Sequence, residues 1–279
     1  MIRSLLYVPA DNEKFVAKAH ERRADAIILD LEDAVAEDRK DSARTSLAAT
    51  VPSVGQNHAS VFVRINSGAR QVADAIAAAR AGAFGIVIAK GRDVSAIESL
   101  AGTLRGIEAD LNRPATCFLV QIEDPAAVLD ARSMAKHQRV IGLMTGGEDL
   151  ATAIGADPIP EVLRFPKLLV HYAAKAEQKL SLGLLRSVTD YADLDGIAAA
   201  AREARAHGFD GATCIHPSAV PLLNEAFSAS PAEIAWAERV VAAAHGQTAG
   251  AFSLDGKMID APVIARALLI LERAKKAED

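Results

Sequence analysis

The chain has 279 residues, and its 31 Lys and Arg against 36 Asp and Glu give a net charge of −5 at pH 7. This acidic balance argues against nucleic acid as a partner, because a protein that binds phosphates needs a basic surface. Hydrophobic residues make up 51% of the chain and charged residues 24%. Such a composition can bury a large core, and it excludes extended disorder.

Features of membrane and secreted proteins are missing from the sequence. No apolar run approaches the roughly 20 residues of a membrane helix, and the start of the chain lacks the layout of a signal peptide. We therefore expect a cytoplasmic protein with no membrane partner. Cys117 and Cys214 each lie in an apolar, strand-like run. Buried, reduced thiols are expected there, with a disulfide or a catalytic thiol as the alternative.

Short β-rich runs alternate with Ala-rich helical stretches, which is typical of a parallel sheet covered by helices. The predicted strands are Ser4–Val8, Ala26–Leu31, Val61–Ile65, Gly85–Ala89, Thr116–Ile122, Val140–Met144, Leu182–Val188 and Ala212–Ile215. The predicted helices include Glu13–His20, Asp41–Ala49, Gln71–Ala81, Ala126–Lys136, Glu161–Lys179 and Leu194–His207. Eight strand–helix units favour an α/β fold with a closed (β/α)8, or TIM, barrel, because an open sheet would leave two edges to protect. A doubly wound open sheet is the alternative.

The residues after the eighth unit predict a separate extension. Pro231–Ala244 and Pro262–Lys275 have helical periodicity. Between them, residues 250–260 form two short β-rich runs around Asp255-Gly256, which is a strong hairpin signal. We therefore predict a barrel domain over residues 1–228 and a helix-hairpin-helix extension over residues 229–279 that packs on a neighbouring subunit.

Charged side chains lie at the C-terminal ends of five of the predicted strands. They are Asp30, Glu32 and Asp33 at the end of the second strand, Arg64 at the end of the third, Lys90 after the fourth, Glu123 after the fifth, and Glu148 and Asp149 after the sixth. Barrel enzymes carry their reactive side chains at the C-terminal ends of the strands, so these residues are expected on one rim. Buried carboxylates need an ion pair or a bound cation. The pattern therefore predicts a functional site.

The ligand types indicate a hard cation. The histidines and cysteines do not have the spacing of a zinc site. Mg²⁺ takes one or two carboxylates and completes its coordination with water and substrate oxygens. Glu123 and Asp149, on successive units, could supply them. In the alternative interpretation these acids form ion pairs with Arg64 and Lys90, and no metal binds.

Seven motifs together resemble one known family. They are Leu5-Leu-Tyr-Val-Pro-Ala-Asp11, Ile28-Leu-Asp-Leu-Glu-Asp-Ala-Val35, Val63-Arg-Ile-Asn66, Gln121-Ile-Glu123, Gly147-Glu-Asp-Leu150, Cys214-Ile-His-Pro217 and Gly256-Lys-Met-Ile-Asp-Ala-Pro262. Their order and spacing resemble the citrate lyase β-subunit-like branch of the aldolase and citrate lyase family, which includes malyl-CoA and citramalyl-CoA lyases.

The resemblance implies a Mg²⁺-dependent carbon–carbon lyase, with Mn²⁺ as an alternative metal. Such an enzyme cleaves or forms a 3-hydroxyacyl-CoA thioester such as malyl-CoA, citramalyl-CoA or citryl-CoA, with a 2-oxo acid and an acyl-CoA as partners. Some relatives also hydrolyse the thioester. A non-catalytic or complex-dependent subunit is one alternative function. A metal-dependent 2-oxo-acid aldolase that acts on free aldehydes is another.

The resemblance also implies residue roles. Glu123 and Asp149 match the metal ligands, and Arg64 matches the arginine that stabilises the negatively charged oxygen during cleavage. Asp260 matches an acid that reaches the active site of a neighbouring subunit, which implies a homo-oligomer, a trimer or a multiple of it. The residues that match the wall around the oxo acid are Glu32, Arg64, Gly147 and Glu148.

Coenzyme A is the expected thioester carrier, with an acyl carrier protein as the alternative. Arg3, Lys14 and Lys18, near the first strand and helix, are candidates to contact its phosphates. A solvated helix face is the alternative for the two lysines. The chain also departs from the family around Lys90, at Asp124-Pro125 and in residues 165–185, so the substrate is left open.

Overall fold

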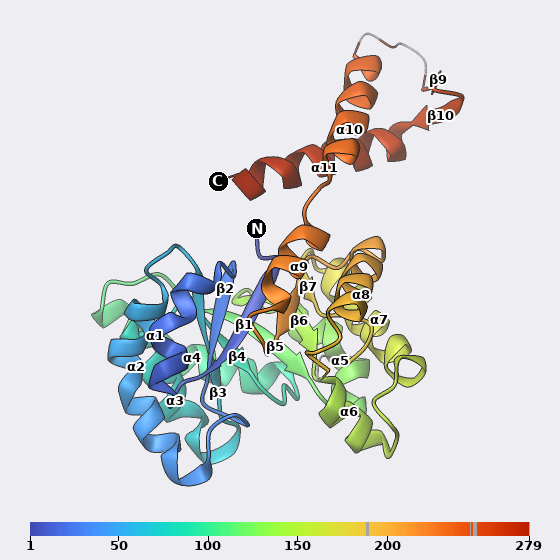
Figure 1. Cartoon of the computed structure of the whole chain (residues 1–279). Coiled ribbons are helices and arrows are strands. Elements are labelled where there is room, and N and C mark those ends of the chain that lie inside the picture. Colours follow the sequence, from blue (N-terminus) through green and yellow to red (C-terminus); the bar gives the residue numbers. More distant parts are fainter. Residues whose placement is uncertain (188–189, 246, 248–249, 279) are drawn as a thin grey trace. The chain divides into compact units, whose positions relative to one another are not determined.

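The structure, a computed structural model, describes residues 1–187, 190–245, 247 and 250–278 (Figure 1). The chain forms two compact units, Ile2–Asn224 and Glu225–Asp279, the second together with Met1. The division falls within helix α9 (Ala219–Phe227), just before the division predicted from the sequence, which follows residue 228.

The first unit is a parallel barrel. In the described part of the chain eight parallel strands follow the order β7-β6-β5-β4-β3-β2-β1-β8. A parallel bridge between Leu182 and Gly211 joins β7 to the residue before β8 and nearly closes the sheet. This strand order confirms the (β/α)8 prediction and excludes the doubly wound alternative. The strands are β1 (Ser4–Pro9), β2 (Ala26–Asp30), β3 (Ser60–Ile65), β4 (Gly85–Ile88), β5 (Cys117–Ile122), β6 (Val140–Thr145), β7 (Leu180–Leu182) and β8 (Ala212–Cys214).

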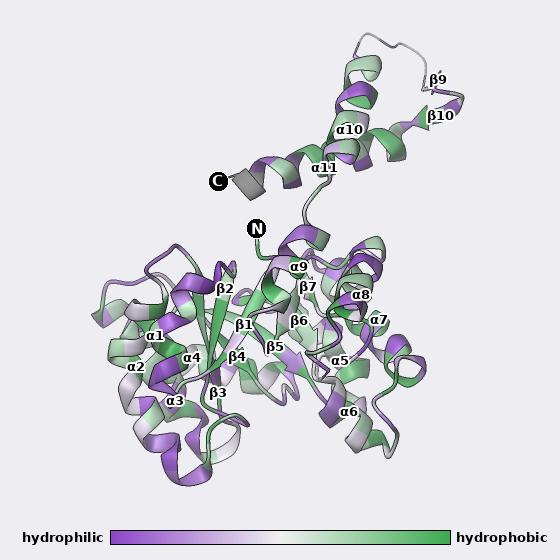
Figure 2. Cartoon of the chain, in the orientation of Figure 1, coloured by the Kyte–Doolittle hydropathy of each residue, from purple (hydrophilic) through white to green (hydrophobic). Residues whose placement is uncertain are grey.

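Apolar side chains from successive strands fill the barrel. Leu5, Ile28, Phe62, Val87 and Leu119 are all buried in one cluster, and each comes from a different strand. Figure 2 shows the strands as predominantly hydrophobic ribbons, as expected for a parallel sheet that is covered on both faces. The core therefore holds the strands in register, so that their C-terminal ends share one rim.

Helices surround the strands. They are α1 (Glu13–Ala19), α2 (Lys40–Val54), α3 (Gln71–Ala81), α4 (Val94–Asp110), α5 (Pro125–Ala135), α6 (Gly147–Ile154), α7 (Pro160–Ala176), α8 (Leu194–Ala206) and α9. Local capping fixes where several of them begin. Asp124, for example, accepts a hydrogen bond from the Ala127 N–H and is followed by Pro125 in the first turn of α5.

The seventh strand differs from its prediction. The sequence predicts Leu182–Val188, but β7 ends at Leu182, because Gly183 adopts φ 144° and turns the chain. Leu184 and Leu185 are buried in the loop that follows, so the apolar run extends beyond the strand. Val188 lies outside the described residues.

Both cysteines are free thiols, as predicted. Cys214 is buried in β8, and burial raises the pKa of its thiol to about 12. Cys117 is partly buried at the start of β5, and burial also raises its pKa. Neither thiol is poised to act as a nucleophile at neutral pH.

The second unit has the predicted helix-hairpin-helix form. Helix α10 (Pro231–Ala244) precedes the antiparallel strands β9 (Ala251–Leu254) and β10 (Lys257–Asp260), and α11 (Ala261–Glu278) follows. The two residues of the turn, Asp255 and Gly256, have φ of 52° and 73°, as the predicted Asp-Gly hairpin requires. Its packing on a neighbouring subunit stays a prediction. Across all described residues, no helix is long and apolar enough to cross a membrane.

Candidate active site

Most of the predicted strand-end residues line one cavity at the C-terminal end of the barrel. Glu32 and Glu123 adjoin it through contacts with Arg64 and Gln121, and Lys90 is paired with Glu32. This cavity has a volume of about 520 Å³. Residues from β1, β2, β3, β5, β6, β7 and β8 and from helices α6 and α7 line it. They include Tyr7, Asp30, Arg64, Gln121, Asp149 and Lys167. Active sites of TIM-barrel enzymes lie at this end of the strands.

Arg64 is held from one side by Asp30. Its Nε and Nη2 donate hydrogen bonds to the two carboxylate oxygens of Asp30, at 2.7 and 2.6 Å. Its guanidinium also lies 4.9 Å from the centre of the Tyr7 ring. Burial disfavours the cation, but the hydrogen bonding to Asp30 and the nearby charges of Tyr7, Asp30 and Glu32 together outweigh that effect and raise the pKa of Arg64. Arg64 is therefore a fixed, permanently charged donor.

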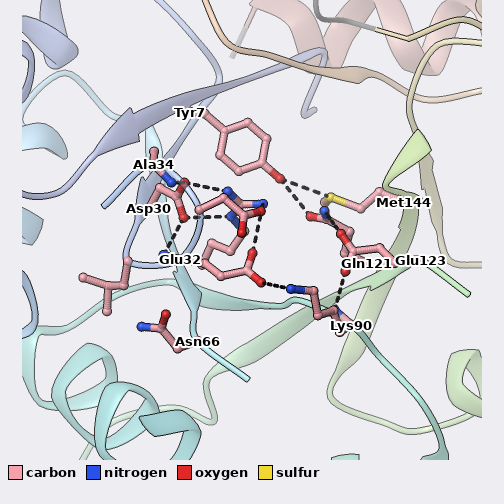
Figure 3. Close-up of polar contacts among 12 residues, drawn as sticks. Tyr7, Asp30, Glu32, Ala34, Asn66, Lys90, Gln121, Glu123 and Met144 are labelled. Atoms are coloured by element: carbon pink, nitrogen blue, oxygen red, sulfur yellow. Dashed lines mark hydrogen bonds and ion pairs between the residues drawn. The ribbon is translucent and has the colours of Figure 1, made fainter. Parts of the chain in front are cut away.

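Glu32 lies between two cations. One carboxylate oxygen is 3.1 Å from Nη1 of Arg64, and the other is 3.1 Å from Nζ of Lys90 (Figure 3). Both oxygens are buried, and neither has a hydrogen-bond partner of good geometry among the described residues. Burial raises the pKa of Glu32, although the nearby charge of Arg64 opposes the rise. Glu32 thus retains unused acceptor capacity at the site.

A buried network positions the loop that carries Glu32. Nζ of Lys40 donates to the Glu32 backbone carbonyl at 2.8 Å and to Oδ1 of Asn66 at 2.5 Å. Asn66 in turn donates its backbone and side-chain N–H groups to Asp74, which is fully buried. Because every member is bonded, the loop after β2 is held in one place.

Glu123 is oriented by two donors. Nε2 of Gln121 donates to one carboxylate oxygen at 2.5 Å, and the backbone N–H of Lys90 donates to the other at 2.8 Å. Lys90 adopts φ 51°, a left-handed conformation that is uncommon for lysine. The Tyr7 hydroxyl donates to Oε1 of Gln121 at 3.0 Å and so fixes which amide atom faces Glu123 (Figure 3). Both oxygens of Glu123 keep further acceptor capacity.

The close approach of Glu123 requires a glycine at position 146. A Cβ on Gly146 would lie only 2.5 Å from Oε1 of Glu123 and 3.0 Å from Nε2 of Gln121. Helix α6 begins directly after this residue, which brings Asp149 into its first turn. The absence of a side chain at Gly146 thus lets β5 and α6 place two carboxylates near each other.

The two carboxylates fit Mg²⁺ better than a metal held entirely by protein. Burial, followed by the charge of Asp149 and that of Glu32, raises the pKa of Glu123 to about 7. A buried carboxylate beside another acid gains from a bound cation. Within the described ranges, no group of three or more His, Cys, Asp or Glu side chains forms a metal site. Two carboxylates with open positions are what Mg²⁺ uses, whereas structural Zn²⁺ needs four ligands.

The predicted residues Glu148, Lys14, Lys18 and Arg3 do not all lie at the cavity. Glu148 is in the first turn of α6 beside Asp149, and its carboxylate accepts a hydrogen bond from the Ser187 hydroxyl at 2.5 Å. Lys14 and Lys18 are exposed on α1, which follows the C-terminal end of β1. Arg3 precedes β1 at the opposite end of the barrel, where its guanidinium is paired with Asp25 at 2.7 Å. Arg3 is therefore not grouped with the other candidates.

Asp260 belongs to the second unit. It ends strand β10, and its Oδ1 accepts a hydrogen bond from the Val263 N–H at 3.3 Å, at the start of α11. The contact is typical of a helix cap. Asp260 is partly exposed, so its carboxylate can still accept a hydrogen bond from another donor.

Several contributors to the site, among them Tyr7, Asp74 and Lys167, were not predicted as site residues. Tyr7 and Asp74 act through Gln121 and Asn66, and Lys167 reaches the cavity from the middle of α7. Of these, Lys167 could have been recognised from the sequence, since Arg164 and Lys167 are the two charged residues in the otherwise apolar helical run 162–170. The other two depend on contacts between distant parts of the chain.

The sequence of the chain matches a protein family over most of its length and several relatives over nearly its whole length. The model of the HpcH/HpaI aldolase/citrate lyase family matches residues 3–217. A (3S)-malyl-CoA thioesterase of Cereibacter sphaeroides is 35% identical over 283 residues, which cover 98% of this chain and 94% of that protein. A citrate lyase subunit beta-like protein of Mycobacterium tuberculosis is 33% identical over 281 residues, with 98% and 95% covered.

A solved structure is similar to this chain over nearly its whole length. It is CitE of Mycobacterium tuberculosis in complex with magnesium, acetoacetate and coenzyme A, with a TM-score of 0.82 and 32% identity, covering 98% of this chain and 97% of that chain. Together with the family match and these relatives, the parallel barrel and its acidic rim define the chain as a lyase of the α/β-barrel class. It belongs to the HpcH/HpaI aldolase/citrate lyase family, as its motifs indicate.

Proposed function

We propose that the chain is a Mg²⁺-dependent lyase that cleaves or forms the carbon–carbon bond between a 2-oxo acid and the α-carbon of an acyl-CoA. The observation that carries this proposal is a buried Glu123 under the influence of the nearby charge of Asp149, at the same end of the barrel as a fixed Arg64. Malyl-CoA and citramalyl-CoA are the proposed test substrates, and citryl-CoA is a third. The names of the relatives support this substrate class.

Glu123 and Asp149 are the residues that would hold the cation. Gln121 and the Lys90 N–H fix the orientation of Glu123 and leave its remaining lone pairs available. Mg²⁺, or Mn²⁺ with the same oxygen ligands, would supply Lewis acidity toward the substrate oxygens when bound. Glu32, Gly147 and Glu148 form the proposed wall around the oxo acid.

Arg64 is the proposed donor to the developing charge. In the cleavage direction the substrate hydroxyl gives its proton to water and its carbon becomes the carbonyl of the 2-oxo acid. The bond between the α- and β-carbons breaks, and its electron pair moves into the thioester as an enolate. Arg64 uses Nε and one N–H of Nη2 for Asp30, and its Nη1 is ion-paired with Glu32, so the second N–H of Nη2 remains to contact the enolate oxygen. Loss of one such donor typically costs about 10² to 10³ in rate.

Asp260 of a neighbouring subunit is the proposed acid. It would protonate the enolate carbon during cleavage and remove the same proton during condensation, a role worth typically about 10² to 10⁴ in rate. This assignment needs at least two copies of the chain, and we propose a trimer or a multiple of it. Lys14 and Lys18 are the proposed contacts for the phosphates of coenzyme A, because α1 follows the C-terminal end of β1.

The direct test is substrate cleavage by the purified full chain. Malyl-CoA and citramalyl-CoA are incubated with Mg²⁺, and the oxo acid is measured as its phenylhydrazone while free CoA is measured with a thiol reagent. We expect Mg²⁺-dependent release of oxo acid that EDTA stops and that Glu123→Gln abolishes. The proposal would be overturned if the chain neither cleaves these substrates nor binds an oxo acid in a metal-dependent way.

The same assay separates the alternatives. A thioesterase releases free CoA and a hydroxy acid, whereas a lyase releases an oxo acid and leaves CoA acylated. An aldolase for free aldehydes turns over without CoA and does not need Asp260. A non-catalytic subunit releases neither product.

A further inference from the structure

Lys167 is a buried cation in the wall of the cavity, and no carboxylate among the described residues forms an ion pair with it. Arg64 and Lys167 are the cations that line this cavity among the described residues. Arg64 is paired with Asp30 at 2.6 Å and lies near Glu32. Lys167 is only 6% exposed, and no carboxylate in the described part of the chain lies within ion-pair distance of its Nζ. A buried charge without a counter-ion is costly, which indicates that a function keeps it there.

The partners of Lys167 place its ammonium at the rim. Nζ donates to the backbone carbonyls of Leu184 at 2.9 Å and Arg186 at 2.8 Å, both in the loop after β7. A Cβ on Gly147, the first residue of α6, would lie 3.4 Å from Nζ. The ammonium therefore lies between the start of α6 and this loop.

One donor of the ammonium is unused by the described residues. A protonated lysine has three N–H groups, and the two carbonyls take two of them. Glu148, whose negative charge acts on Lys167, accepts a hydrogen bond from Ser187. Burial lowers the pKa of Lys167 to about 8 against that charge, so the protonated form predominates at pH 7. The third N–H is available to a ligand in the cavity.

The start of α6 adds to this positive end of the cavity. The first backbone N–H groups of a helix have no partner within the helix and favour an anion. In α6 these groups belong to residues from Gly147 onward, beside Lys167. Two independent features thus make this end attractive to a carboxylate.

We infer that Lys167 is a binding residue for the carboxylate of the 2-oxo acid: its ammonium completes, together with the start of α6, a pocket for that anion. The inference rests on the proposed function, because it uses the same cavity and the same substrate. Lys167 also holds the loop after β7 against α6, so binding and loop position must be separated by experiment.

The test measures binding of pyruvate and of Mg²⁺ by calorimetry. Pyruvate has a single carboxylate, so no second acidic group can compete for the ammonium of Lys167. Lys167→Gln removes the charge but keeps two N–H donors for the loop carbonyls, Lys167→Met removes both, and Lys167→Arg keeps the charge. The matched control is Lys175→Met, which removes a cation from the same helix, where it is paired with Asp210.

We expect Lys167→Gln to weaken Mg²⁺-dependent pyruvate binding by about 10- to 100-fold, the value of a charged hydrogen bond. The affinity for Mg²⁺ alone should change little. Lys167→Arg should retain most of the pyruvate affinity, and Lys175→Met should bind pyruvate as the unmodified chain does. If Lys167→Met fails to fold, Lys167→Gln still decides the question.

Two results would overturn the inference while leaving the proposed function intact. In one, Lys167→Gln binds pyruvate as tightly as the unmodified chain. In the other, pyruvate and Mg²⁺ binding weaken together and Lys167→Arg does not rescue them, which is the behaviour of a loop support alone. Failure of the unmodified chain to bind pyruvate with Mg²⁺ would instead count against the proposed function, and the inference would fall with it.

Discussion

Arg64 and Asp30 form a buried, two-point ion pair in which Nε and Nη2 meet both oxygens of one carboxylate, at 2.7 and 2.6 Å. Asp30 also accepts hydrogen bonds from the backbone N–H groups of Glu32 and Ala34. One carboxylate therefore fixes both the arginine and the loop that carries Glu32. Since Asp30 ends β2 and Arg64 lies opposite it in β3, the parallel register itself creates the pair.

Asp30→Asn should disturb both stability and turnover. An amide can accept only one of the two hydrogen bonds from Arg64, and breaking a buried ion pair of this kind costs about 3 kcal/mol. Because Arg64 would no longer be held in place, kcat/KM should fall by about 10²-fold. Chemical denaturation and steady-state kinetics measure the two effects.

Glu108→Gln is the matched control for that change. Glu108 and Arg139 form a similar two-point pair, at 2.6 and 2.7 Å, near the starts of β5 and β6. Its loss should lower stability by a comparable amount and leave kcat/KM unchanged. An equal loss of activity in the two variants would contradict the role of Asp30 in positioning Arg64.

Gly146→Ala should weaken metal binding through a steric effect. The new Cβ would meet Oε1 of Glu123 at 2.5 Å, so the carboxylate must move from its position. Gly146 has φ −79°, a value that alanine adopts easily, so backbone strain does not contribute. We expect Mg²⁺ affinity, measured by calorimetry, to fall about tenfold or more, as when other groups that orient metal ligands are disturbed.

Gly106→Ala provides the comparison for a new methyl group. Gly106 lies within α4, and a Cβ there would have no neighbour within 4 Å. This variant should bind Mg²⁺ normally and gain about 0.5 to 1 kcal/mol of stability, because alanine favours a helix. Normal Mg²⁺ binding by Gly146→Ala would show that Glu123 does not need its observed position.

The fold was predictable because its signals are local. Alternating apolar runs and helical stretches predicted the eight strands, and Asp255-Gly256 predicted the hairpin. The seventh strand was misplaced because Leu184 and Leu185 are buried in a loop. An apolar run reports burial, and only hydrogen-bond register distinguishes a buried strand from a buried loop.

The site was predictable only in part. Parallel strands bring their C-terminal ends to one rim, which is why Arg64 and Glu32, taken from sequence position alone, lie 3.1 Å apart. The sequence did not reveal that Asp30 binds Arg64 or that Lys167 reaches the cavity from α7. Such contacts join elements distant in the chain, and a charged residue within a helix usually faces solvent.

Stability should show a pH dependence that originates at His171. Its buried ring stacks on Phe209 with 4.5 Å between ring centres, and Nδ1 lies 2.9 Å from the Ser181 hydroxyl. Burial, with the nearby charge of Lys175, lowers the pKa of His171, although Asp210 opposes the shift. The unfolded chain therefore binds this proton more readily, so stability falls as the pH drops below the ordinary histidine value of about 6.5.

Denaturation at pH 7.5 and pH 5 checks this expectation. The unmodified chain should lose more stability between the two values than His171→Asn, which keeps a polar partner for Ser181. His58→Asn, at an exposed position with φ 68°, controls for the removal of a histidine. The prediction is wrong if all three proteins lose the same free energy of unfolding between pH 7.5 and pH 5.

Asp260 should be needed for turnover but not for binding of the oxo acid. Asp260→Asn keeps the size of the side chain and an oxygen that can accept from the Val263 N–H, so the second unit should stay folded. If Asp260 transfers the proton, kcat should fall by about 10² to 10⁴, with Mg²⁺-dependent pyruvate affinity unchanged.

Mixed oligomers test whether Asp260 acts across subunits. Asp260→Asn and Arg64→Ala chains are each expected to be inactive. When they are unfolded and refolded together, some sites should combine the intact Arg64 of one chain with the intact Asp260 of the other, and activity should return in proportion to mixed oligomers. Refolding each variant separately before mixing is the control. Full activity of a monomeric fraction from size-exclusion chromatography would show instead that each chain completes its own site.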